Sequence, residues 1–341
     1  MTSERQAATD AGPIDLAGDD AVLPFSVEPL DVRGRVVYLG DTVDAILQRH
    51  AYPPAVSRLL GEAIVLTALL GTSLKFEGRF ILQTQTNGPV SMLVVDFETP
   101  DAIRACAKFK DEAVAEAVAA GRASPSELLG TGTLAMTIDQ GRHMNRYQGV
   151  VALDGGSLED VAHQYFAQSE QIPTRVRLAV GEVLERRAGE TPSHAWRAGG
   201  LIVQFLPESP ERMRKPDLHP GDVPEDVDLP SGEEDDAWVE AQVLVDTIKD
   251  VELTDPAMAA ERLLIRLFHE RGVRVFDPTP LHDRCRCSHE RVGEMLRGFS
   301  ADDIDHMTVN GEIEVTCEFC NSTYHFDPAE FEGASDGDDR P

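Results

Sequence analysis

The stretches Cys285-Arg286-Cys287 and Cys317-Glu318-Phe319-Cys320 decide how the C-terminal part of this chain folds, and they hold four of its five cysteines. Two close cysteine pairs, separated by the length of a small module, are typical of one tetrahedral Cys₄ zinc site in a chain whose thiols stay reduced. Thiolates are soft ligands that suit Zn²⁺. The sequence therefore predicts one Zn²⁺ ion per chain, bound by Cys285, Cys287, Cys317 and Cys320.

The metal would be the main stabilising element of this module, which we place at residues 276–331. So short a segment cannot bury a large apolar core, whereas a structural zinc contributes on the order of 10–16 kcal/mol of folding free energy. Four thiolates around Zn²⁺ also leave an excess of negative charge that nearby groups must offset. We expect Arg284, Arg286 and Arg291 to do so, unless these side chains are simply exposed.

The remaining candidate ligands are weaker. Four cysteines already complete a tetrahedron, so the nearby histidines are expected at the surface: His282, His289, His306 and His325. Cys106 stands alone in the sequence and is expected to be a buried, inert thiol. The C-x-C spacing is unusual for a structural zinc site. Two interpretations stay open: a permanently bound structural zinc, or a zinc that is released when the cysteines are oxidised.

A helical linker precedes the zinc module, in the segment 208–275. A helix is predicted over 237–249, and Asp255-Pro256 is expected to begin the next helix as N-cap and first-turn proline. Leu263, Leu264, Leu267 and Phe268 then follow the spacing of one apolar helix face. This stripe is a candidate client-binding surface that could cover the core domain when docked; the alternative is permanent core.

The rest of the chain divides into a core domain and polar segments. Residues 22–207 are predicted to fold as a mixed α/β core domain, because strands in hairpins alternate with helices, which gives the whole chain an α+β class. Residues 1–21 are expected to form a disordered tail and 332–341 an acidic tail. The run 222–236 holds eight acids and no lysine or arginine, and is read as a solvated insert.

Composition excludes several classes of function. The formal net charge is −29, from 31 basic and 60 acidic residues. Such a charge disfavours binding to nucleic acid, which needs clustered basic side chains, and to anionic membranes. The most apolar stretch, Ala63 to Leu70, is too short to span a bilayer, and the opening residues lack the apolar region of a secretory signal. We therefore expect a soluble protein of the reducing cytoplasm.

Several further stretches carry a family resemblance. They are Cys285-Arg286-Cys287-Ser288, Val315-Thr316-Cys317-Glu318-Phe319-Cys320, Tyr324-His325-Phe326, Leu267-Phe268-His269-Glu270, Val273-Arg274-Val275-Phe276, Gln148-Gly149, Tyr165-Phe166, Ser169-Glu170-Gln171-Ile172-Pro173-Thr174 and Gly199-Gly200-Leu201. Together they make the chain, from about residue 22 onward, resemble the 33 kDa heat shock protein family, which are redox-regulated chaperones of the bacterial cytosol. The acidic run 222–236 is longer than the family pattern requires.

The resemblance implies a holdase that works without ATP and is not an enzyme. The reduced, zinc-loaded form would be inactive. Peroxide or hypochlorite, together with unfolding heat, would oxidise the cysteines to the disulfides Cys285-Cys287 and Cys317-Cys320 and release the zinc. Such local disulfides close tiny loops and remove little entropy from the unfolded chain, so the module would unfold and the linker would loosen. The protein would then form a homodimer and hold unfolding client proteins.

Two other functions stay open on the residues alone. Cys317-Glu318-Phe319-Cys320 is also the spacing of a thiol–disulfide oxidoreductase, although that motif should open a helix in a βαβ unit, and here it follows a strand-like segment. A zinc ribbon that binds other macromolecules is the second alternative. No common hydrolase, nucleotide-binding or metalloprotease motif is present.

Overall fold

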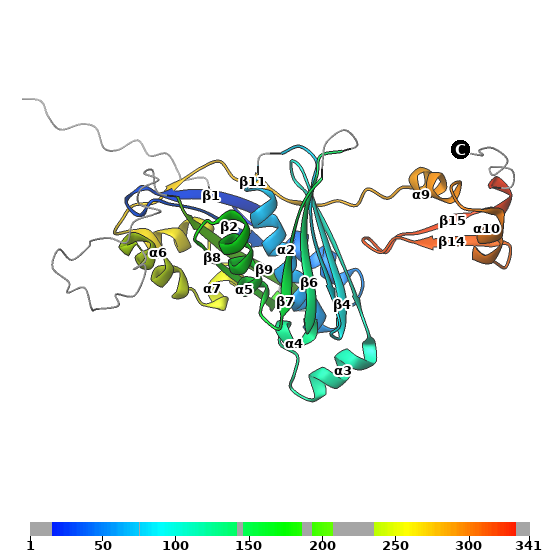
Figure 1. Ribbon diagram of the computed structural model, residues 1–341, viewed down its shortest axis with the longest axis horizontal. Helices are drawn as coiled ribbons and strands as arrows, with labels where there is room; N and C mark the ends of the chain where they lie inside the picture. The colour runs from blue at the N-terminus through cyan, green and yellow to red at the C-terminus, as the bar shows by residue number, and fades with distance from the viewer. Residues whose placement is uncertain (1–15, 75, 142–145, 186–192, 207–234, 332–341) are drawn as a thin grey trace, which may run out of the picture.

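The computed structural model describes residues 16–74, 76–141, 146–185, 193–206 and 235–331. Its N-terminal part is organised around one helix, α2 (Pro54–Gly71), which lies between two β-sheets (Figure 1). Pro54 occupies the first turn, where its missing N–H has no intrahelical partner to lose. Among the described helices, α2 is long and apolar enough to cross a membrane, but 78% of it is buried inside the protein, as in the core helix of a globular domain.

The first sheet is antiparallel and has the strand order β10-β1-β2-β9-β8, with β11 also paired to β1. Its strands are β1 (Ala21–Val27), β2 (Val32–Leu39), β8 (Thr174–Glu185), β9 (Ser193–Phe205), β10 (Arg274–Val275) and β11 (Thr279–Pro280). A 3₁₀ turn, Glu28–Leu30, joins β1 to β2. Side chains alternate along β2: Val37 and Leu39 pack toward α2, whereas Val36 and Tyr38 belong to the core on the opposite face.

The second sheet covers the other side of α2 in the order β12-β5-β4-β3-β6-β7. Its strands are β3 (Arg79–Thr86), β4 (Val90–Glu98), β5 (Ala102–Phe109), β6 (Thr131–Asp139), β7 (Tyr147–Asp154) and β12 (His282–Asp283). The helices of this domain besides α2 are α1 (Asp41–Gln48), α3 (Asp111–Ala119), α4 (Pro125–Leu129) and α5 (Leu158–Tyr165), which continues as a π-turn over Phe166–Glu170. Sequential antiparallel strands with helices between them confirm the predicted α+β class.

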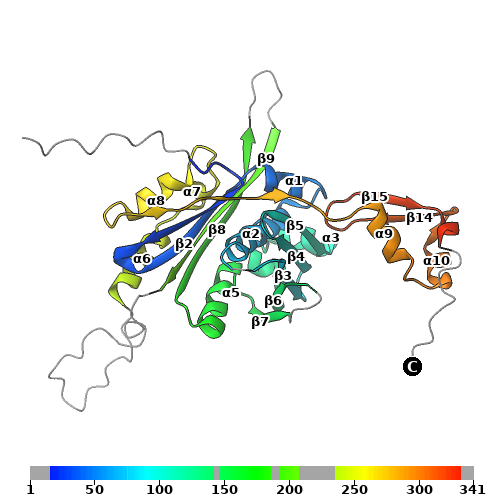
Figure 2. The ribbon, with the colours of Figure 1, turned by 90° about the horizontal axis from the view of Figure 1, so that it is seen from above.

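The linker helices cover the outer face of the first sheet. Figure 2 shows α6 (Asp236–Asp246), α7 (Asp250–Thr254) and α8 (Ala260–Phe268) on one side of that sheet and α2 on the other. The stripe of α8 packs against β1, β2 and β9 in a second hydrophobic core. Leu263 and Leu264 are 0% exposed, Leu267 3% and Phe268 1%. In this conformation the candidate client surface is therefore fully covered.

Two adjacent glycines allow helices to pack closely on both faces of β9. A Cβ atom on Gly199 would lie 2.2 Å from the carbonyl oxygen of Leu253 in α7, and one on Gly200 would lie 2.4 Å from Val65 in α2. Either contact is far shorter than real Cβ atoms tolerate. The Gly199-Gly200 pair therefore brings the linker and the core helix to the same strand.

The C-terminal module has very little apolar core. It comprises α9 (His289–Leu296), α10 (Ala301–Met307), the three-stranded sheet β13 (Thr308–Val309), β14 (Glu312–Thr316) and β15 (Thr323–Phe326), and a last 3₁₀ turn at Pro328–Glu330. Its buried cluster holds only Leu296, Ile304, Ile313, Phe326 and Phe331. A buried cluster of this size is too small to stabilise a fold by itself. The small core therefore agrees with the prediction that a metal ion stabilises the module.

The segment between linker and module ties both sheets together. Strands β10 and β11 pair with β1, and β12 pairs in parallel with β5 of the other sheet. The expected boundary at residues 275 and 276 therefore falls inside a segment that adds strands to the core domain. Beyond it the module projects from the core, with the tip of the β14–β15 hairpin directed back toward it (Figure 1).

Some expectations are corrected. Residues 16–21, assigned to a disordered tail, are held in place: Arg197 donates to Asp19, and the backbone N–H groups of Gly40 and Thr42 donate to Asp20. The helix expected to begin at Asp255-Pro256 begins at Ala260 instead, because Asp255 caps the end of α7. Residues 1–15, most of the acidic run (222–234) and the acidic tail (332–341) lie outside the described residues.

The burial pattern of α8 makes a testable prediction. Leu264→Ala should lower the free energy of unfolding by about 2–5 kcal/mol, because it leaves a cavity between α8 and the sheet, and should increase binding of an apolar dye by the reduced protein. Ile265→Ala is the matched control, since Ile265 is 53% exposed on the same helix. Denaturant titrations and dye fluorescence measure both effects. Equal behaviour of the two variants would show that the stripe is not a packed surface.

Candidate metal centre

The first cysteine pair follows directly after β12, the last strand that pairs with the core domain. Strand β12 runs parallel to β5, and the backbone N–H of Arg284 donates to the carbonyl of Ile103, which extends this pairing to the residue before Cys285. After Cys287, Ser288 caps α9 by accepting from the backbone N–H of Arg291. Cys285 and Cys287 are thus fixed between the edge of a core sheet and the beginning of a helix.

The second pair lies in the turn between β14 and β15. The backbone N–H of Cys317 donates to the carbonyl of Ser322, and the N–H of Asn321 donates to the carbonyl of Cys317. Asn321 adopts the left-handed conformation that closes the turn, with a φ of 57°. Cys317 and Cys320 therefore point to one side of a tight hairpin tip rather than opening a helix.

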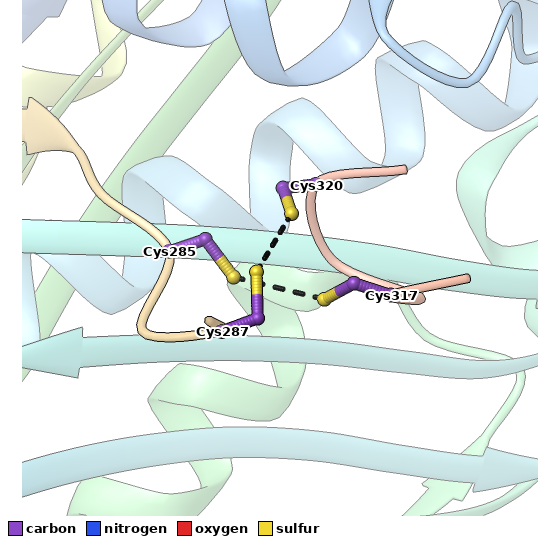
Figure 3. Close-up of side chains that lie close together, drawn as sticks. All are labelled: Cys285, Cys287, Cys317 and Cys320. Carbon is purple, nitrogen blue, oxygen red and sulfur yellow. Dashed lines mark hydrogen bonds between the residues drawn. The ribbon is translucent and has the colours of Figure 1, made fainter. Parts of the chain in front are cut away.

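The four sulfurs converge on one point (Figure 3). All four lie within 4.8 Å of one another, with 3.7 Å between Cys285 and Cys317 and 3.1 Å between Cys287 and Cys320. A tetrahedral Zn²⁺ with Zn–S bonds of about 2.3 Å would place its sulfurs about 3.8 Å apart. The donor set and the spacing therefore fit a metal ion, and the cluster of cysteines predicted from the sequence is present.

The protonation of these thiols shows why the cluster needs a cation. Burial raises the pKa of Cys287 to about 12, and it also raises the pKa of Cys317. For Cys320, burial acts in the same direction, but hydrogen bonds with Ser322 and Cys287 outweigh it and lower its pKa to about 6. Cys287 and Cys317 therefore resist ionisation unless a cation lies among the sulfurs.

Arg104 of the core domain connects directly to this cluster. Its Nη1 lies 3.7 Å from the sulfur of Cys285, and its Nε and Nη2 donate to the buried carboxylate of Asp96 at 2.9 and 2.6 Å. Its guanidinium lies over the ring of Phe319, 3.9 Å from the ring centre, in a cation–π contact. Arg104 on β5 thus contacts Cys285 of the first cysteine pair and Phe319, which lies between the two cysteines of the second pair.

The hairpin tip is held on the core by further contacts around Phe319 and its neighbours. Nη1 of Arg49 and Nε2 of His50 lie 3.4 and 3.2 Å from the carbonyl oxygen of Phe319. Lys108 pairs with Glu318 at 2.7 Å, and the side chain of Asn321 donates to the carbonyl of Arg49. Arg49 also pairs with Asp283, just before the first cysteine pair. The cluster is therefore the contact point between the module and the core domain.

The three arginines that were predicted to offset the charge of the thiolates have other partners. Arg284 pairs with Asp101 at 3.0 Å, Arg286 with Glu98 at 3.2 Å, and Arg291 donates to the carbonyl of Arg286. Within the part of the chain that the structure describes, these three arginines do not hydrogen-bond a cysteine sulfur, whereas Arg104, which the sequence analysis missed, does. The sequence holds no signal for it, because it lies far upstream on an alanine-rich strand.

The histidines and the fifth cysteine behave as expected. The four sulfurs form the metal-binding group without any histidine: His282, His289, His306 and His325 are exposed. His289 instead packs against the ring of Phe326. Cys106 is buried, 4% exposed, and burial raises its pKa to about 12, which makes its thiol a poor nucleophile. Tyr324, which donates to Cys287 at 3.1 Å, is a contact that the sequence did not reveal.

The ligand assignment can be tested by metal content. Cys285→Ser should weaken zinc binding by more than roughly tenfold, since losing a ligand costs more than losing a partner of a ligand. Cys106→Ala should keep one zinc per chain, because Cys106 lies outside the cluster. Elemental analysis of the reduced proteins after dialysis against a chelator measures both. One tightly held zinc in Cys285→Ser would contradict the assignment.

The contact with Arg104 can be tested separately from metal binding. In the double variant Asp96→Asn/Arg104→Gln, which leaves no buried charge unpaired, amide exchange in the turn 317–321 should accelerate about tenfold, because a cation–π contact and a hydrogen bond together contribute about 1–2 kcal/mol. Without a chelator, zinc should stay at one per chain, because all four sulfur ligands are kept. Arg284→Gln, which removes only a surface pair, is the control. Unaltered exchange in the double variant would show that Arg104 does not hold the module.

Comparison with known proteins agrees with this architecture. A family model described as "Hsp33 protein" matches residues 20–327. The "33 kDa chaperonin" of Caulobacter vibrioides is 46% identical over 323 residues, covering 94% of this chain and 99% of the relative. That of Shewanella loihica is 35% identical, covering 92% and 94%. A crystal structure of the 33 kDa chaperonin from Thermotoga maritima has the same fold, with a TM-score of 0.68 at 20% identity, covering 92% and 97% of the two chains. The chain belongs to the Hsp33 family.

Proposed function

We propose that this protein is a redox-regulated, ATP-independent holdase chaperone of the cytoplasm, inactive when reduced and zinc-bound. The observation that carries the proposal is the position of the cysteine cluster. It lies where a module with a five-residue core meets the core domain, and the chain between them continues from the helix whose apolar stripe is covered. The redox state of four sulfurs then controls how much apolar surface is free.

The chemistry of the switch follows from the ligands. Two thiolates that form a disulfide give up two electrons, and hydrogen peroxide accepts them with two protons and becomes two molecules of water. Two such reactions consume all four cysteines. A disulfide sulfur is no longer an anionic ligand, so the site loses its affinity for Zn²⁺, the ion it would hold when reduced.

The pairing Cys285-Cys287 and Cys317-Cys320 is the one that would release the module. The two sulfur contacts in the reduced protein cross between the segments, Cys285 with Cys317 and Cys287 with Cys320. Disulfides in that crossed pattern would close long loops and keep the two segments joined. Disulfides between neighbours close only tiny loops and leave the module without a staple. Peptide mapping of the oxidised protein distinguishes the two patterns.

Release of the metal ion would also destabilise the contacts of the linker with the core domain. The module core is too small to persist, and the hold of Arg104 and Arg49 on the hairpin tip depends on its shape. The strands β10 to β12 are only two residues each and lie between the module and α8. Once they detach, the stripe Leu263, Leu264, Leu267 and Phe268 becomes a surface for unfolding client proteins, or for a second copy of the chain in a homodimer.

Both alternative functions are less well supported. A thiol–disulfide oxidoreductase places its C-x-x-C motif at the beginning of a helix, whereas Cys317 and Cys320 lie in a hairpin turn. A zinc ribbon that recruits partners would present its hairpin tip, but here Phe319, Glu318 and Asn321 of that tip contact the core domain. We therefore propose no enzymatic activity.

The proposal predicts that oxidation and chaperone activity rise together. Reduced protein should suppress aggregation of a heat-unfolding client only weakly. After peroxide treatment at raised temperature it should release one zinc per chain, lose four free thiols and suppress aggregation strongly. Zinc release, thiol count and light scattering are measured on the same samples, with Cys106→Ala as a control that should behave like wild type. Equally strong suppression before oxidation would contradict the switch.

A further inference from the structure

A cavity of about 380 Å³ opens beyond the C-terminal end of α2, on the side of the core domain away from the linker helices. The helix ends at Gly71, while the two sheets that flank it extend further. The space between them is lined by residues from both sheets and from α5. Its volume lies within the range of pockets that bind small ligands or single side chains of a peptide.

Most of the cavity wall is apolar. Six of these side chains are Leu74, Phe80, Met136, Tyr147, Phe166 and Ile172. Phe80 and Met136 are buried at its base, each 3% exposed, whereas Tyr147 and Leu74 at its rim are 52% and 39% exposed. Large apolar side chains at a concave rim form a contact surface for an apolar group of a partner.

Two arginines of β2 line the same cavity. Arg33 and Arg35 are two residues apart, so both lie on the face of the strand that carries Val37 and Leu39 toward α2. Arg33 is exposed, and Arg35 is half-buried, with its Nε shielded from water and without a hydrogen-bond partner. Burial lowers the pKa of Arg35, as it does for a cation that no carboxylate compensates.

These two arginines differ from others of this acidic chain. Arg197 pairs with Asp19, Arg175 with Asp246, and Arg271 with Glu240. Among the described residues, no carboxylate forms an ion pair with Arg33 or Arg35. The one acid that lines the cavity, Glu170, instead accepts a hydrogen bond from the hydroxyl of Tyr165 at 3.1 Å.

We propose that this cavity binds an extended segment of a partner protein in which an aromatic or branched apolar side chain is followed by Asp or Glu. The apolar side chain enters between Phe80, Met136 and Phe166. The carboxylate reaches the two guanidinium groups, which are the donors best suited to hold it in a two-pronged hydrogen bond. Charge complementarity selects this partner, because a chain of net charge −29 disfavours acidic segments over most of its surface, whereas this cavity combines an apolar wall with two guanidinium groups.

The test uses the full-length reduced protein, so that it is independent of the redox switch. The probes are a fluorescein-labelled peptide Ser-Leu-Phe-Asp-Asp-Ser and its twin with Asn in place of both Asp, and fluorescence polarisation measures their binding. The acidic peptide should bind at least about tenfold more tightly than the amide twin, since hydrogen bonds between charged groups are stronger than those to a neutral amide. Arg35→Gln should remove this preference, and Arg33→Gln, at an exposed position, should reduce it.

The controls separate charge from packing. Arg58→Gln removes the same charge from an exposed position near the beginning of α2 and should leave the preference intact. Tyr147→Ser should weaken the binding of both peptides alike.

Equal binding of the two peptides, no effect of Arg35→Gln, or no peptide binding would overturn the proposal. So would dissociation of a pre-existing dimer by Arg35→Gln, which would make a second copy the occupant, or binding of decanoate without the peptide. None of these outcomes bears on oxidation-dependent aggregation suppression.

Discussion

The C-terminal module of this protein is organised around four sulfur atoms that lie within 4.8 Å of one another. Thiols so close do not ionise together unless a cation balances them, and the module they belong to has a buried core of only five residues. The cluster is therefore both the least self-sufficient part of the chain and the part that holds its neighbours together. A module whose fold depends on one coordination site would unfold when the ligands of that site change chemically.

The location of the cluster gives this dependence a consequence beyond the module. Arg104 contacts the buried Asp96, the sulfur of Cys285 and the ring of Phe319, so one side chain of the core domain connects to both cysteine segments. The same connecting segment contributes short strands to both sheets and leads back to α8. Chaperone activity under redox control, as we propose, needs such a mechanical path between a chemical sensor and a covered apolar surface. Here the path is short and built mainly of polar contacts, which break without the loss of a large apolar core.

The core domain and the linker helices share one sheet. Its central helix lies between two sheets, and the glycine pair in β9 lets α7 and α2 approach that strand from opposite faces. The linker helices can therefore cover the sheet closely without contributing to the core around α2, so two separate hydrophobic cores share one sheet. In the mechanism that we propose, the linker layer would detach while the core around α2 persists. At the open end of α2, Arg33 and Arg35 form no ion pair with a carboxylate of the described residues, so the acidic surface has a local exception there.

The sequence by itself determined the cysteine cluster, the fold class and the apolar stripe, because each follows from local spacing: C-x-C with C-x-x-C, alternating strands, and the i, i+3, i+4 repeat of α8. It missed β5, since this alanine-rich segment has little strand propensity of its own and is a strand through its pairing with β4 and β12. It placed the beginning of α8 too early, because Asp255 capped the preceding helix instead. Only the tertiary structure decided that Arg104 contacts the cluster, that β12 joins β5, and that the stripe is covered. Those contacts link residues far apart in the chain, where local spacing carries no information and packing alone chooses the partner.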